Sequence, residues 1–130
     1  MLGAMDAAQA IGDLTEISPQ VKRVAVVEAY GAISGANVAD DVAQRLADGA
    51  RSLVDAAEEL RPGVAQLEAA TVDGSVFVVR DGDRLIAATT SPEPTVGLVF
   101  YDLKTCLRSI EPPAAKPARR RRKEADDAAA

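Results

Sequence analysis

The sequence contains no histidine and only one cysteine, Cys106. Imidazole is the usual general base of enzymes and, together with cysteine, the usual ligand of zinc, so both kinds of site lack their main side chains. A single cysteine also excludes a disulfide within the chain. Aromatic residues make up only 3% of the chain, so a core has to be built from alanine, valine, leucine and isoleucine. These absences exclude most enzyme templates.

Long apolar runs and phosphate-binding loops are also missing. No apolar run approaches the roughly 20 residues that span a bilayer. The first ten residues, MLGAMDAAQA, lack the basic region and apolar run of a secretory signal, so we expect a cytoplasmic protein. No glycine-rich loop ends in Gly-Lys-Ser/Thr, and the segment from Gly31 to Gly35 is interpreted as a turn. We therefore expect no nucleotide turnover by this chain, no small-molecule substrate, no metal and no cofactor.

Positive charge is scarce in the first 110 residues and concentrated in the last 20. Residues 1–110 hold nine Lys and Arg against sixteen Asp and Glu, whereas residues 111–130 hold six against four. An acidic body repels a phosphate backbone, so nucleic acid is a poor partner for it. Residues 111–130 have almost nothing to bury and are predicted to be a disordered tail.

Hydrophobic periodicity divides residues 1–110 into helices and strands, enough for one domain. Asp73-Gly74 and Asp81-Gly82 favour tight hairpin turns, so the last three strands are predicted to form an antiparallel meander. The order α-β-β-α-β-β-β-α predicts an α+β fold in which helices flank both faces of a five-stranded antiparallel sheet. Helices are expected over about residues 6–16, 37–60 and 91–110, and strands over residues 21–30, 32–35, 64–72, 75–80 and 84–90.

Two helix starts carry residues suited to capping. Asn37 is predicted to cap the middle helix, with Asp40 and Asp41 near its positive end. Ser91 and Pro92 are predicted to cap and begin the last helix, because proline suits a first helical turn.

The middle helix has a wider apolar stripe than a surface helix needs. Leu46, Leu53 and Leu60 recur every seven residues, and alanines recur at the adjoining heptad position. One interpretation is that one edge packs on the chain's own sheet and the other on a second copy. The alternative is a core helix of a monomer, and periodicity alone does not decide between them. The alanines are Ala43, Ala50 and Ala57.

Three stretches of the sequence resemble the roadblock family, which is named after a dynein light chain. They are Leu14 with VKRVAVVEAYG, the meander VAQLEAATVDGSVFVVRDGDRLIAATT, and the final PEPTVGLVFYDLKTCLRSI. The resemblance covers about residues 2–110, and the segment GAISGAN is shorter than the second strand of most members. The family includes bacterial regulators of Ras-like GTPases and endosomal scaffold proteins.

The resemblance implies a homodimer in which the middle helix packs on its mate and the third strand pairs with its mate. It also implies a non-enzymatic function, either regulation of a small Ras-like GTPase or, as the alternative, a scaffold without effect on nucleotide turnover. On this sequence the implied dimer interface consists of Ala43, Leu46, Ala50, Leu53, Ala57, Leu67 and Ala69.

Charged residues offer two further candidate contacts. One is the flank of the middle helix, formed by Arg45, Asp48, Arg51 and Asp55, for which solubility is the competing interpretation. The other is the cluster in the tail, which could add a weak contact with an anionic membrane or could simply be solvated. Its members are Arg119, Arg120, Arg121, Arg122 and Lys123.

Two features are interpreted without a functional role. Glu58 and Glu59 are adjacent on a helix, so their side chains diverge by about 100° and are expected on a solvated face. Cys106 lies on the apolar stripe of the last helix, where a free cysteine usually behaves as a small hydrophobic residue.

Overall fold

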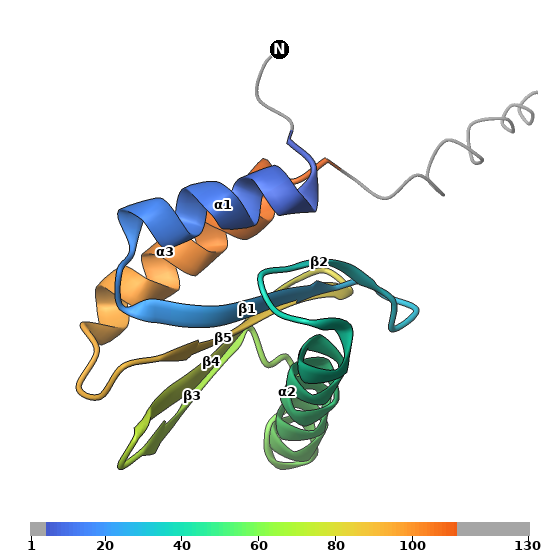
Figure 1. The fold of residues 1–130 in the computed structure, drawn as a ribbon. Coiled ribbons are helices and arrows are strands. Elements are labelled where there is room, and N and C mark those ends of the chain that lie inside the picture. Colours follow the sequence, from blue (N-terminus) through green and yellow to red (C-terminus); the bar gives the residue numbers. More distant parts are fainter. Residues whose placement is uncertain (1–4, 112–130) are drawn as a thin grey trace, which may run out of the picture.

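The computed structural model describes residues 5–111 of the chain. The predicted α+β fold is confirmed, since α1 and α3 lie on one face of a five-stranded sheet and α2 lies on the other (Figure 1). Of the tail predicted at residues 111–130, the structure describes only Glu111, so the basic cluster at residues 119–123 lies outside the described residues. The elements are α1 (Ala7–Ile17), β1 (Val21–Val27), β2 (Ile33–Ala36), α2 (Asp40–Leu60), β3 (Gln66–Thr71), β4 (Gly74–Asp81), β5 (Arg84–Thr90) and α3 (Val96–Ser109).

The strands form one antiparallel sheet in the order β2-β1-β5-β4-β3, so β2 and β3 are its edges. The β3-β4 and β4-β5 connections are the two predicted hairpin turns. Gly74 and Gly82 there have φ angles of 140° and 66°, which residues with a side chain rarely adopt. A Cβ atom at Gly74 would also collide with the carbonyl oxygen of Thr90, so this position requires glycine.

The face of the sheet under α1 and α3, here the closed face, is covered along its length. Leu14 of α1 and Leu103 of α3 pack on Val26 and Phe77 of the sheet, and all four are buried. Phe77 also contacts Phe100 of α3 edge to face, with ring centroids 4.9 Å apart. Two antiparallel helices therefore complete this half of the core.

The opposite face, here the open face, has only α2 over it. Ala50 and Val54 of α2 pack on Val27, Val78 and Leu85 of the sheet. The helix lies mainly over β1, β2 and β5. Strand β3 is left at the margin of this cluster.

Both predicted capping assignments are wrong, because contacts between distant segments take their place. Helix α2 begins at Asp40, and the side chain of Asn37 instead accepts a hydrogen bond from the Val24 N–H at 2.8 Å. The same amide donates to the Lys22 carbonyl oxygen at 3.0 Å, which extends the pairing of β1 beyond the short strand β2.

Helix α3 begins at Val96, not at Pro92. Glu93 has a φ of 55° and precedes Pro94, and a residue before proline avoids the helical region. The Thr95 N–H at the start of α3 donates to the side chain of Gln20 at 2.6 Å, so this helix end is also satisfied from a distant segment.

Candidate interaction surface on helix α2 and strand β3

Helix α2 has an inward-facing stripe of small side chains. These residues face the sheet of the same chain and are buried there. Because their side chains are short, the helix axis can lie close to the strands. We refer to this set as the alanine stripe, and it consists of Ala43, Ala47, Ala50 and Val54.

A second apolar stripe follows the neighbouring side of α2. Its members are spaced by three and four residues, so they line up along one side of the helix. Leu46 and Leu53 are half-buried, Leu60 is 84% exposed, and the two small residues between them are exposed. Within residues 5–111 no element covers this side. We refer to this set as the leucine stripe, and it consists of Leu46, Gly49, Leu53, Ala56 and Leu60.

Four of the five predicted dimer residues of α2 divide between these two stripes, and Ala57 lies between them. Ala43 and Ala50 are only 2% and 1% exposed, so they offer almost no surface to a second copy. Leu46, Leu53 and Ala57 retain accessible surface. The heptad pattern predicts that the alanines and the leucines share one seam, whereas the fold turns Ala43 and Ala50 toward the sheet and leaves Ala57 half-buried.

Strand β3 presents an edge of the sheet beside α2. It pairs with β4 alone, so its other edge has no strand beside it in the described part of the chain. Leu67 lies opposite Val78, and Ala69 lies opposite Val76, which places both on the open face. Both are half-buried. Open edges of this kind are the usual sites of strand pairing between chains.

A brace of hydrogen bonds fixes β3 relative to α2. The Glu58 carboxylate accepts from the Gly63 and Val64 N–H groups at 3.1 and 2.8 Å, and from Arg80 of β4 at 2.8 Å. The backbone bonds, first that of Val64, hold the pKa of Glu58 below its ordinary value of 4.5, and Arg80 adds to the effect. About one third of the Glu58 side chain stays exposed, so the predicted solvated position holds in part, but the carboxylate is also bound by the turn and by Arg80. The proximity of Glu58 to the Pro62-Gly63 turn in sequence is the signal that could have indicated this role.

The predicted charged flank is not one continuous surface. At about 100° per residue, Arg45 lies beside the leucine stripe, whereas Asp48, Arg51 and Asp55 lie toward the other side of α2. Asp48 accepts a hydrogen bond from the Gln44 side chain at 3.0 Å. The two ion pairs among residues 5–111 are Arg80 with Glu58 and Arg84 with Glu28, so none of the four is paired there.

The flank of α2 opposite the leucine stripe borders an open hollow of about 430 Å³ beside β2. Asp40, Ala43 and Gln44 line it from the first turns of α2, and residues 33–36 and Val38 line it from the other side. The hollow is polar, and Asp40 makes it acidic.

The described residues contain little that could perform chemistry. No group of three histidine, cysteine, aspartate or glutamate side chains in this range could hold a metal ion. Burial raises the pKa of the Cys106 thiol to about 11, and the charge of Asp13 adds to this shift. Near neutral pH the thiol is therefore largely protonated, and thiol reagents should react with it slowly. Within the same range no helix is both long and apolar enough to cross a bilayer.

Comparison with solved structures places this fold among known ones. A Roadblock/LC7 domain from Streptomyces avermitilis matches with a TM-score of 0.68 at 17% identity, over 82% of this chain and 93% of that domain. MglB from Myxococcus xanthus matches with a TM-score of 0.62 at 14% identity, over 79% of this chain and 89% of MglB.

The gliding protein MglB from Thermus thermophilus matches with a TM-score of 0.62 at 13% identity, over 80% of this chain and 84% of that protein. No protein-family model matches the sequence, and none of the curated proteins matches it. At these identities the likeness is one of fold.

Proposed function

We propose that this chain, which has the roadblock fold, is a non-enzymatic homodimer that binds and regulates a small Ras-like GTPase in the cytoplasm. The observation that carries the proposal is the leucine stripe of α2 lying uncovered on the same face as the open edge of β3. This combination suits association, because an apolar helix side and a free strand edge are both surfaces that a second copy can complete.

The dimer requires a two-fold arrangement in which the same surface of each copy meets its equivalent. In such an arrangement Leu46 and Leu53 pack on their mates, and Gly49 allows the two helices to approach closely. Strand β3 pairs with β3 of the partner, which adds Leu67 and Ala69 to the contact. The sheet then runs through both copies as ten strands.

Several observations support a GTPase as the partner. The sequence resembles a family that includes bacterial regulators of Ras-like GTPases, and two of the structural neighbours are MglB proteins. The chain carries no phosphate loop of its own, so it would act by contact with the GTPase. Arg45 is the charged residue nearest the leucine stripe, so the two copies of Arg45 flank the helix pair and form the proposed contact. Such contacts act on a GTPase by ordering its switch loops.

The test is a GTP hydrolysis assay with a Ras-like GTPase encoded next to this chain. We expect the protein to accelerate hydrolysis, and the dimer-breaking variant Leu53→Asp to lose the acceleration. The matched control is Ile17→Asp, an equally drastic change at an exposed residue of α1 on the closed face. Binding without acceleration would support the scaffold function instead. GTP turnover without any added GTPase would contradict both.

A further inference from the structure

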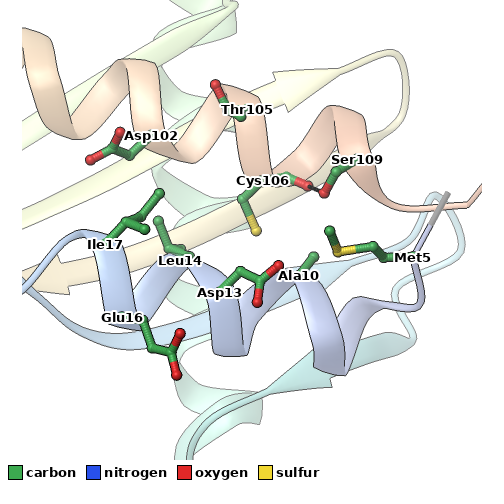
Figure 2. A pocket seen from close by; sticks show the side chains of 10 residues that line it. All are labelled: Met5, Ala10, Asp13, Leu14, Glu16, Ile17, Asp102, Thr105, Cys106 and Ser109. Carbon is green, nitrogen blue, oxygen red and sulfur yellow. Dashed lines mark hydrogen bonds between the residues drawn. The ribbon is translucent and has the colours of Figure 1, made fainter. Parts of the chain in front are cut away.

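A groove lies between α1 and α3 (Figure 2), the two helices on the closed face, opposite α2 (Figure 1). Its volume is about 320 Å³, and its floor is mainly apolar. Met5 lies at one end and Ile17, which is 64% exposed, lies near the other. Cys106 points into the groove between them. Ala10 and Leu14 complete the floor.

The groove has three carboxylates and no cation among the residues that line it. Asp13 and Glu16 come from α1, and Asp102 comes from α3. None of them belongs to either of the two ion pairs formed within residues 5–111. Although Asp102 is only 7% exposed as a residue, its carboxylate oxygens keep contact with solvent, since the one buried polar side-chain atom without a partner within residues 5–111 is the Ser18 hydroxyl. A cationic occupant would therefore be stabilised at this site.

The chain leaves the folded domain at one end of this groove. The Met5 N–H donates to the Ser109 carbonyl oxygen at 2.9 Å, and the Glu111 N–H donates to the Met5 carbonyl oxygen at 2.8 Å. The Arg84 guanidinium donates to the Glu111 carbonyl oxygen at 3.0 Å. Since Met5 itself lines the groove, residue 111 is fixed beside its entrance.

The segment after residue 111 carries the positive charge that is missing from the groove. Six of the 15 Lys and Arg residues of the chain lie after residue 111, and five of these are consecutive at 119–123. The eight residues from Glu111 to Arg119 span up to about 28 Å, whereas α1 is about 16 Å long, so the cluster can reach every carboxylate of the groove. A tethered segment also has an effective concentration on the order of millimolar, so a weak contact is sufficient.

We propose that the basic segment at residues 119–123 of this same chain docks on the α1-α3 groove and covers Cys106, with its cations paired to Asp13, Glu16 and Asp102. The groove then holds the tail in a folded-back state. High salt or a competing anionic surface releases it, because contacts between solvated charges are screened.

The only cysteine of the chain provides the measurement. We compare alkylation of Cys106 by N-ethylmaleimide in the full chain and in a full-length variant with Arg119, Arg120, Arg121, Arg122 and Lys123 all changed to Gln. At low salt the variant should react at least about threefold faster, which corresponds to docking in about two thirds of the molecules. Added salt should raise the rate of the native chain to that of the variant, whose rate should change little. Equal rates at low salt would overturn the proposal.

The groove carboxylates are tested by Asp13→Asn combined with Glu16→Gln, in both tail backgrounds. The quantity to compare is the alkylation rate with the five-glutamine tail divided by the rate with the native tail. This ratio cancels the direct effect of Asp13, which itself raises the pKa of Cys106. We expect that ratio to fall to one. The matched control, Asp48→Asn with Asp55→Asn on α2, should leave it unchanged. A ratio that survives loss of the groove carboxylates, or protection that grows with protein concentration and so comes from another copy, would overturn the proposal.

A second readout does not depend on thiol access. Backbone amide spectra of the native chain and the five-glutamine variant should differ along α1 and α3, including Ala10 and Cys106. They should agree along α2. Differences absent from α1 and α3 would overturn the proposal.

Discussion

The closed and open faces of the sheet are covered in different ways. On the closed face two helices bury large side chains such as Leu14 and Leu103 almost completely. On the open face a single helix buries mainly alanines, while Leu46 and Leu67 remain partly accessible. Burial of apolar area stabilises roughly in proportion to the area removed from water. The closed face therefore supplies most of the stability of one chain, and the open face keeps apolar surface available for association.

The same contrast is seen in the two ion pairs. Arg84 and Glu28, 2.9 Å apart, are largely buried near the end of the closed face, where Arg84 also binds the carbonyl oxygens of Ile110 and Glu111. Arg80 and Glu58, 2.8 Å apart, are about one quarter to one third exposed beside α2. The closed face thus contains a largely buried ion pair, whereas the ion pair beside α2 is partly exposed to solvent.

The largest effect is expected from Leu103→Asp on the closed face. Leu103 is completely buried, so the carboxylate would be placed in the core at a cost of several kcal/mol, comparable with the whole stability of a small domain. We expect a chain that is unfolded at 25 °C by circular dichroism. A cooperative native-like melt would contradict the assignment of the main core to this face.

The same change on the open face, Leu53→Asp, should leave the chain folded and dissociate the proposed dimer. The side chain is half-buried in one copy, so most of the cost arises only when two copies meet. Light scattering should report the mass of one chain, with a native circular dichroism spectrum. An unchanged dimer mass would rule out the leucine stripe as the contact.

Arg84→Leu should lower the free energy of unfolding by about 3 to 5 kcal/mol, because it leaves Glu28 buried without its partner. Urea denaturation measures this loss. Adding Glu28→Leu should recover part of it, since the uncompensated charge is then gone. The control, Arg80→Leu beside α2, should have a smaller effect, because its partner Glu58 retains two backbone hydrogen bonds and access to water.

The smallest effect is expected from Glu58→Gln, and it depends on pH. The pKa of Glu58 is lowered in the folded chain, so its carboxylate stabilises the fold above the ordinary value of 4.5. This contribution is lost as the pH falls through the lowered pKa. The variant should therefore melt below the native chain at pH 7, and the difference should shrink as the pH falls below 4.5. A constant difference between pH 7 and pH 3 would contradict the role of the charge.

Local patterns were sufficient to predict the order of elements, the hairpins and the two-faced covering of the sheet. Asp73-Gly74 and Asp81-Gly82 specify their turns by backbone chemistry alone, so they could be located without tertiary information. The helix starts could not, because Asn37 binds β1 and Thr95 binds Gln20, contacts that join segments distant in sequence. Capping preferences describe an isolated helix end and do not include such competitors.

The sequence was sufficient to predict that α2 has apolar surface for a second contact, but not which of its residues form that surface. The apolar excess of α2 was visible in the heptads, but neighbouring heptad alanines and leucines are separated by only about 40° to 60° around the helix. Which column faces the sheet depends on how α2 sits over β1 and β5. The groove between α1 and α3 was invisible for the same reason, since Asp13 and Asp102 come together only when the two helices pack.

The pairing of Met5 with residues 109 and 111 has a consequence for larger architectures. Both ends of the described chain emerge together beside α1 and α3, on the side of the sheet opposite α2. In a dimer joined through α2 and β3, the closed faces of the two copies point outward. A domain fused to either end of the described chain would therefore extend from these outer faces. Each copy could then carry one fused domain without blocking the surface formed by the paired α2 helices, so the dimer would present two fused domains at once.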